Sequence, residues 1–308
     1  MALRGAQREN SFFLNLETLE ICNLDIETSP GPWSPSFHVD FRAGILGNRF
    51  PVFCSGKLQP SNVDVDFCTF WGHDSKNSIE IPGREDPAIV QWDFGSIWLT
   101  GGYDRAETKP SKKTFIISLD EVKDGPELPF PNSKHCMVQI DDSTYAMIGG
   151  DKRKHQLQFY SKKTGLWTTG PSTPSSHAGM FGCTVFELQG SKAIAVVGGK
   201  DANQDYSNRV EFYKMDSMTW EEGPDLDEGL IGFALVTGKN GKILYTIGGD
   251  PSYGAIRVLD CSIGTCPDAW TRHGGKVDNQ VFAGPPGGGF YNGGHVMVPD
   301  KMMDQKCP

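Results

Sequence analysis

Short runs of alternating apolar and polar residues fill most of the chain, separated by turns rich in glycine, proline and aspartate. The alternation is clearest in residues 157–160, 210–213 and 256–259. Period-2 runs bounded by such turns predict half-buried β-strands. No segment keeps a helical period over a dozen residues, so the pattern predicts a chain that is nearly all β.

A Gly-Gly doublet ends one strand of each repeating unit. The doublets are Gly101-Gly102, Gly149-Gly150, Gly198-Gly199 and Gly248-Gly249, and Cys54-Ser55-Gly56 is a degenerate earlier copy. The second residues of the five copies are 46, 48, 49 and 50 residues apart. A fixed period of about 20–50 residues indicates a repeat architecture.

Each unit contains the material for four short strands. An apolar stretch precedes the strand that ends in the doublet, a polar loop leads to an alternating strand, and a tight turn leads to a last strand carrying Trp167, Trp220 or Trp270. Four-stranded units of about 50 residues in series predict a β-propeller, in which radial repetition protects the strand edges.

The doublet, the aromatic strand (Phe159-Tyr160 and Phe212-Tyr213) and a tryptophan 17–21 residues after the doublet resemble the kelch repeat over roughly residues 31–272. The resemblance implies a kelch-type propeller that binds partners through loops on one face. Two units depart from the pattern: Ser55 replaces a glycine, and Asp124 stands where a tryptophan is expected.

The two ends of the chain are expected to supply the strands of a sixth blade. Residues 12–24 resemble the last two strands of a unit, and residues 280–283 and 295–298 resemble the first two. We therefore expect an all-β, six-bladed propeller with four antiparallel strands per blade, closed by pairing of N- and C-terminal strands. Residues 1–10 are expected to form a disordered extension and residues 11–308 a single propeller, with the closing blade shared between about 11–28 and 273–308. The six third strands should begin near Phe12, Phe67, Phe115, Leu157, Val210 and Ile256.

The net charge and the hydropathy of the chain limit the classes of partner that we expect it to bind. The formal net charge is −9 and the isoelectric point about 5.3, whereas nucleic-acid binders are usually basic. No apolar run approaches the ~18 residues of a membrane span. We expect a monomer that binds a protein, with no nucleic acid and no membrane span.

The chain has eight cysteines, and each can be assigned to a blade of the predicted propeller. Neighbouring strands or a shared blade make Cys54–Cys68, Cys261–Cys266 and Cys22–Cys307 candidate disulfides. Cys136 and Cys183 are expected to be buried free thiols. The three pairs resemble those of secreted invertebrate kelch-domain proteins, which favours an extracellular location. The cytoplasm is the alternative, because the N-terminus lacks a signal peptide and the chain has no Asn-x-Ser/Thr sequon.

The chain shows no catalytic signature. It contains no Gly-x-Ser-x-Gly elbow, no Walker motif and no His-x-His or His-Glu-x-x-His pair. The stretch 284–289 is most simply a glycine-rich loop. We nominate no catalytic residue, no metal ligand and no cofactor.

Basic residues concentrate in the loops that follow the doublets, although the whole protein is acidic. This candidate binding set is Arg105, Lys109, Lys112, Lys152, Arg153, Lys154, His155, Lys200 and Arg209. The simpler interpretation is that charged residues belong in surface loops. The sequence thus favours a non-enzymatic protein-interaction module with a partner that carries negative charge. The alternative is a carbohydrate-active enzyme or glycan-binding protein that uses the mouth of the propeller channel.

Overall fold

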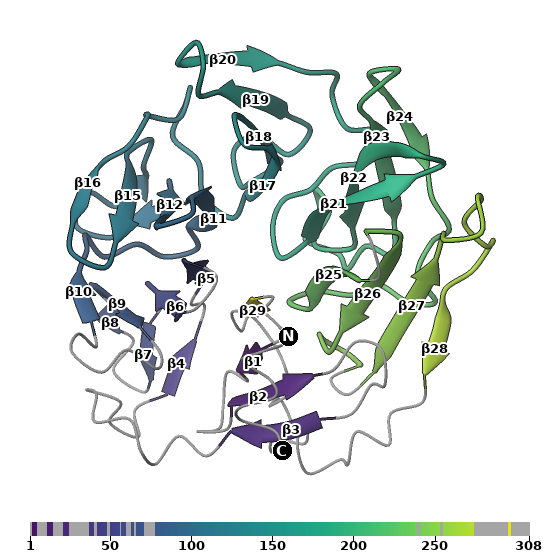
Figure 1. Cartoon of the computed structure of the whole chain (residues 1–308), viewed down its shortest axis with the longest axis horizontal. Helices are drawn as coiled ribbons and strands as arrows, with labels where there is room; N and C mark the ends of the chain where they lie inside the picture. The colour runs from purple at the N-terminus through teal and green to yellow at the C-terminus, as the bar shows by residue number, and fades with distance from the viewer. Residues whose placement is uncertain are drawn as a thin grey trace. The chain divides into compact units, whose positions relative to one another are not determined.

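Runs of β-branched and aromatic residues between glycine-rich turns form strands throughout the computed structural model (Figure 1). It describes residues 2–4, 11–14, 21–24, 37–39, 42–47, 50–55, 57–59, 63–64, 66–70, 78–238, 241–252, 255–273 and 295–296. No α-helix occurs in these ranges, and therefore none of the length and apolar character that crossing a bilayer requires.

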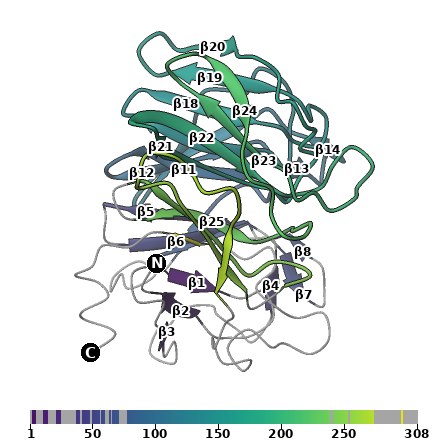
Figure 2. The same cartoon turned by 90° about the vertical axis from the view of Figure 1, so that its right-hand side faces the viewer.

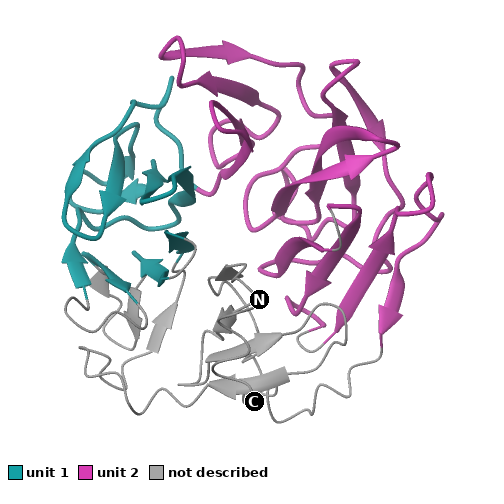
Figure 3. Ribbon diagram, viewed as in Figure 1, with its two compact units in different colours: residues 1–133, 292–308 teal, residues 134–291 magenta. Residues whose placement is uncertain are grey.

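The chain divides into two compact units (Figure 3). The first comprises Met1–Ser133 with Asn292–Pro308, and the second comprises Lys134–Tyr291. The single propeller over residues 11–308 stays a prediction.

The first unit contains two four-stranded antiparallel sheets built from neighbouring stretches of chain. One has the order β10-β9-β6-β5 and the other β11-β12-β15-β16. Their strands are β5 (Arg42–Leu46), β6 (Phe50–Cys54), β9 (Phe67–Phe70), β10 (Ser78–Glu80), β11 (Ala88–Asp93), β12 (Ser96–Thr100), β15 (Thr114–Ser118) and β16 (Val122–Asp124). Smaller sheets join β13 (Tyr103–Asp104) to β14 (Lys109–Pro110), and β4 (Phe37–Val39) to β7 (Lys57–Gln59) and β8 (Val63–Asp64).

A further sheet of the first unit combines both ends of the chain, in the order β29-β1-β2-β3. Its strands are β1 (Ala2–Arg4), β2 (Ser11–Leu14), β3 (Ile21–Leu24) and β29 (His295–Val296). Ala2 is paired with Val296. This differs from the expected disordered extension over residues 1–10, because β1 supplies the second strand in place of the C-terminal segment. A strand of three residues is too short to show an alternation of apolar and polar residues.

The second unit contains three four-stranded antiparallel meanders, each in chain order. The first consists of β17 (Cys136–Asp141), β18 (Thr144–Ile148), β19 (Leu157–Ser161) and β20 (Leu166–Thr169); Figure 2 shows β18, β19 and β20 in that order. The others are β21 (Gly182–Leu188), β22 (Ser191–Val197), β23 (Val210–Lys214) and β24 (Thr219–Glu222), then β25 (Ala234–Gly238), β26 (Ile243–Ile247), β27 (Ile256–Asp260) and β28 (Thr271–His273).

Five of the four-stranded sheets among the described residues are antiparallel blades whose strands follow one another along the chain, which is the construction of a β-propeller. The fold class is therefore an all-β propeller. The sheet of the two termini is separate from these five, and a closed ring of six blades stays a prediction. All six expected third strands are the third strands of their sheets.

The second strand of each meander in the second unit lies in the core. All five residues of β26 and the last five of β22 are buried. The recurring tryptophans tie neighbouring repeats: Trp220 Nε1 donates to Pro171 O at 3.0 Å, and Trp270 Nε1 to Pro224 O at 2.8 Å. Each proline follows the glycine of the Gly-Pro turn in the preceding repeat, so this turn and the tryptophan form one recurring contact.

Three disulfides occur among the described residues: Cys54–Cys68, Cys136–Cys183 and Cys261–Cys266. Cys54–Cys68 and Cys261–Cys266 are two of the expected pairs. Cys54 and Cys68 lie directly opposite each other on β6 and β9.

The expectation of two free thiols at Cys136 and Cys183 is wrong. Their Cα atoms are 6.1 Å apart and their sulfurs are bonded. The first strands β17 and β21 lie side by side, which brings the two cysteines within bonding distance. The expected Cys22–Cys307 bond lies outside the described residues, which do not include position 307.

Candidate functional site

The glycine doublets fix the loops that connect neighbouring sheets. The second glycine donates its N–H to a carbonyl in the segment entering the next sheet: Gly102 to Asn132 (2.9 Å), Gly150 to His177 (3.0 Å) and Gly199 to Leu230 (2.8 Å). The first glycine donates to the residue before the third strand, for example Gly149 to Gln156 at 2.9 Å. Each doublet thus holds two loops at once.

Only glycine fits these positions without strain. Gly149 has φ +60° and Gly199 has φ +89°, in the region that favours glycine. A Cβ added at Gly149 would lie 2.6 Å from His177 O, and one at Gly199 would lie 2.4 Å from Phe181 Cβ. The glycines therefore allow the close approach of the neighbouring loop.

The degenerate doublet keeps the same geometry with a serine. Ser55 has φ +65°, like the first glycines of the complete doublets. Its hydroxyl donates to the carbonyl of Arg84, which lies in the segment entering β11. A side-chain hydrogen bond here holds the segment that a doublet glycine contacts elsewhere.

In the first unit, each predicted binding residue is compensated by a nearby carboxylate. Arg105 pairs with Glu85 at 2.8 Å, Lys109 with Glu107 at 3.1 Å, and Lys112 with Glu127 at 2.6 Å. Apart from the partly buried Glu85, these side chains are exposed, and exposed pairs contribute only about 0–1 kcal/mol. These three residues therefore do not form an uncompensated positive patch.

In the second unit, two predicted residues again form surface ion pairs, Lys152 with Asp151 at 3.5 Å and Arg209 with Asp225 at 3.1 Å.

The other predicted residues of this unit join its loops together. Lys154 Nζ donates to Ala202 O at 3.1 Å, and Nδ1 of His155 lies 3.0 Å from Thr173 O, to which it donates. The backbone of Lys200 is bridged to Gly179 and Tyr206. Lys152, Arg153, His155 and Arg209 remain exposed. The loops after two doublets therefore present lysine and arginine side chains, while Lys154 and His155 hydrogen-bond to neighbouring loops.

Sequence reasoning missed a set of buried polar side chains. Gln158, Glu211 and Arg257 each occupy the second position of a third strand and are 5%, 2% and 0% exposed. In all three strands this position is a polar residue between two apolar ones. That signal could have identified the set.

Glu211 anchors the loop before β21. Its carboxylate accepts from the Ser175 backbone N–H at 2.6 Å and lies 2.9 Å from Nε2 of His177. Burial raises the pKa of Glu211, but the hydrogen bonds from His177 and Ser175 outweigh burial and hold that pKa below its ordinary value. The carboxylate is therefore a structural anion that fixes the loop.

Arg257 plays the corresponding part before β25. Its guanidinium is fully buried and forms ion pairs with Asp227 and Glu228, and Arg272 pairs with Asp227 at 2.9 Å. Burial raises the pKa of Asp227, but hydrogen bonding and the charge of Arg257, followed by those of Arg272, lower it overall. The loop 224–233 is therefore held by the ion pairs of Arg257. The loop before β21 is held instead by the contacts of Glu211 with Ser175 and His177.

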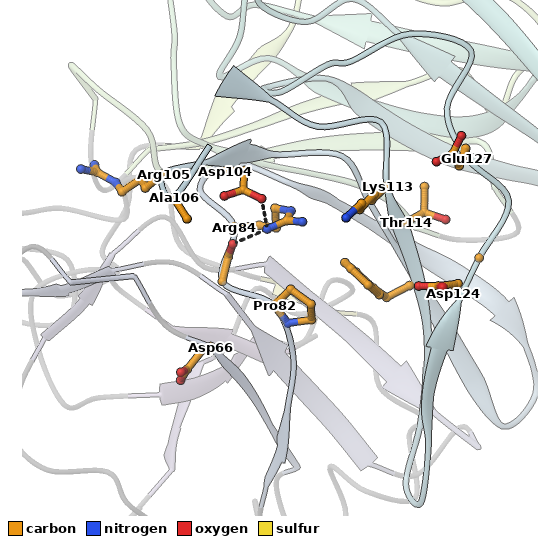
Figure 4. A pocket seen from close by; sticks show the side chains of 13 residues that line it. Asp66, Pro82, Arg84, Asp104, Arg105, Ala106, Lys113, Thr114, Asp124 and Glu127 are labelled. Carbon is orange, nitrogen blue, oxygen red and sulfur yellow. Dashed lines mark hydrogen bonds and ion pairs between the residues drawn. The ribbon is translucent and has the colours of Figure 1, made fainter. Parts of the chain in front are cut away.

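A cavity of about 810 Å³ lies in the first unit (Figure 4). Its lining comprises Asp66, Pro82, Gly83, Arg84, Asp104, Arg105, Ala106, Lys113, Thr114, Phe115, Asp124, Gly125 and Glu127. Arg84 is 4% exposed and pairs with Asp104 at 2.9 Å. The cavity brings Arg105 of the predicted set close to residues that we did not nominate.

Within the described ranges, no three His, Cys, Asp or Glu side chains are placed to hold a metal ion. The carbohydrate-active alternative finds no support among these residues.

The chain is 24% identical over 208 residues to β-scruin of Limulus polyphemus, across 62% of this chain. β-scruin is a kelch-repeat protein. The chain therefore has a kelch-repeat relative, and its four-stranded blades are consistent with the kelch-repeat propeller family. The match spans 22% of the length of β-scruin. No protein-family model matches the chain.

Proposed function

We propose that this kelch-like propeller is a non-enzymatic protein-interaction module. It binds a partner that carries negative charge through the loops that follow the glycine doublets. Kelch similarity supports an interaction role. The residues proposed to contact the partner are the nine basic loop residues, of which Lys152, Arg153 and His155 are exposed on a single loop.

The observation that carries this proposal is the anchoring of the loops by the doublets. Gly150 and Gly199 hold the segments that enter the next sheets through hydrogen bonds of 3.0 and 2.8 Å. Lys154 connects the loops of two repeats through Ala202 O. A pre-ordered binding surface loses little conformational entropy on association, which favours affinity.

The test is capture of the full chain by immobilised poly-glutamate over a range of salt concentrations. Reversal of charge in Lys152→Glu, Arg153→Glu and Lys154→Glu should weaken capture at least tenfold and reduce its salt dependence. The matched control is Lys162→Glu, Lys163→Glu and Lys192→Glu, which changes the same charge in the same unit within or beside β-hairpin turns. Equal capture of both triple variants would refute the docking surface. Capture by heparin alone would indicate an anionic glycan instead.

The complete architecture belongs to the same proposal. We infer six blades in one ring, formed by residues 11–308 together with the strand Ala2–Arg4. The pairing of β29 with β1 supports closure by N- and C-terminal strands. Three disulfides fit an oxidising, extracellular compartment. Intact mass after alkylation without reductant tests the compartment: six to eight blocked cysteines support it, and eight free thiols refute it.

A further inference from the structure

Arg84 is placed in the first-unit cavity by backbone contacts on two sides. The hydroxyl of Ser55 holds its carbonyl, and a Cβ at Gly102 would lie 3.0 Å from Arg84 Cβ. The next residue, Glu85, exchanges two backbone hydrogen bonds with Tyr103 at 3.0 and 2.7 Å. The position of Arg84 is therefore set by the degenerate doublet and the complete doublet together.

Half of the guanidinium of Arg84 has no acceptor among the described residues. Its Nη1 donates to Gly83 O at 2.8 Å and pairs with Asp104 Oδ2 at 2.9 Å. Nε is buried without a hydrogen-bond partner, and no described residue accepts from Nη2 either. Nη2 is therefore the donor of this guanidinium that is left for a ligand, and a hydrogen bond from a charged donor to a carboxylate is among the stronger ones.

The surroundings of Nη2 carry a net positive charge. Figure 4 shows the guanidinium between Asp104 and Lys113. Lys113 is exposed and has no ion pair among the described residues. Arg84 and Lys113 against Asp104 leave one positive charge, which one carboxylate would neutralise. The guanidinium carbon of Arg84 lies 5.8 Å from the centroid of the Phe115 ring, within the range of a cation–π interaction.

The rest of the cavity has the opposite charge. Asp124 and Asp66 also line it and form no ion pair with described residues. A ligand with only negative charge would be repelled by these carboxylates. A ligand with both charges would satisfy the two groups, and about 810 Å³ is enough for a short peptide segment.

We propose that this cavity binds an acidic side chain of a protein partner that is followed by a basic one. The carboxylate lies against Nη2 of Arg84 and Nζ of Lys113, and the basic group lies toward Asp124. This inference rests on the proposed docking function and gives it a specificity pocket.

The test uses isothermal titration calorimetry of the full chain with an acetylated, amidated peptide that contains Glu-Lys between glycines. Replacing the glutamate of the peptide by glutamine should weaken binding at least tenfold. Arg84→Lys, which retains the charge but loses the planar guanidinium and its Nη2 donor, should have a similar effect, and Lys113→Gln should weaken binding about three- to tenfold. Lys123→Gln, on β16 and outside the cavity, is the matched control and should bind like the wild type.

Binding that is unchanged by both Arg84→Lys and Lys113→Gln would overturn the site. Because Lys113 is exposed, its variant tests the site even if Arg84→Lys misfolds. Free glutarate serves as the second ligand. If it binds as tightly as the peptide and with the same dependence on Lys113, the assignment to a peptide partner is overturned.

The triple variant at residues 152–154 separates this proposal from the proposed function. It should lose poly-glutamate capture while the Glu-Lys peptide still binds. Peptide binding without poly-glutamate capture by the wild type supports the cavity and refutes the basic docking loops. The reverse result refutes the cavity alone.

Discussion

Replacement of Gly199 by alanine tests whether the doublets stabilise the fold by allowing close approach of a neighbouring loop. At φ +89°, the new Cβ would lie 2.4 Å from Phe181 Cβ and 2.8 Å from both the Cα and the N of Phe181. Two of these three atoms belong to the backbone, so rotation of a side chain cannot relieve the overlap. We expect Gly199→Ala to lower the free energy of unfolding by about 2–4 kcal/mol.

Gly190 provides a matched control in the same sheet. It has φ +83°, and a Cβ there would have no atom within 4 Å. Both variants pay about 1–2 kcal/mol for a left-handed alanine, and both recover about 0.4–1 kcal/mol because alanine restricts the unfolded chain. Gly190→Ala should therefore cost about 1.5 kcal/mol or less. The difference between the variants isolates the overlap, for which about 1–3 kcal/mol is expected.

The assay is urea unfolding followed by tryptophan fluorescence, with the slope of the transition compared among the three proteins. Equal slopes allow the midpoints to be converted to free energies. Equal destabilisation by Gly199→Ala and Gly190→Ala would refute the reasoning, because φ alone would then account for the doublet.

Three other perturbations test contacts within the second unit. Cys136→Ala with Cys183→Ala should cost about 4 kcal/mol without reductant, since the bond closes a loop of 47 residues; an unchanged urea midpoint would contradict this. The pKa of Glu211 is lowered despite burial, mainly by His177, so its stabilisation is present above pH 4.5 and is lost as the pH falls through the lower folded-state pKa. The wild type should accordingly lose more stability than Glu211→Gln below about pH 4.5, and parallel pH curves would speak against it. Trp220→Phe removes a 3.0 Å hydrogen bond and should lower the free energy of unfolding by about 1 kcal/mol, measured by urea unfolding. An unchanged free energy of unfolding would show that this hydrogen bond makes no net contribution to stability.

The strands were predictable because the recurring glycine doublets align the repeats of the chain with one another. Once the doublets are aligned, the third strands follow at Leu157, Val210 and Ile256, and the structure places them there. The strand Ala2–Arg4 was not predictable in this way. Three residues carry no periodicity, and pairing with Val296 is a contact between opposite ends of the chain.

The candidate site was predictable in position but not in charge. Basic residues such as Lys112 are visible in the sequence, whereas its partner Glu127 belongs to another loop and is brought near only by the fold. Arg84 was missed for a related reason. An arginine in a loop is usually exposed, and only the contacts of Ser55 and Gly102 show that this one is enclosed.

The anchoring of loops by the doublets also bears on how such a protein can evolve. The doublet holds a loop at its two ends, at the glycines and at the residue before the third strand, as Gly149 and Gln156 illustrate. Residues between these ends can be exchanged, inserted or deleted without changing the register of the strands. A lineage could therefore acquire new partners by diversifying these interior positions, while purifying selection maintains the glycines and the sheets unchanged.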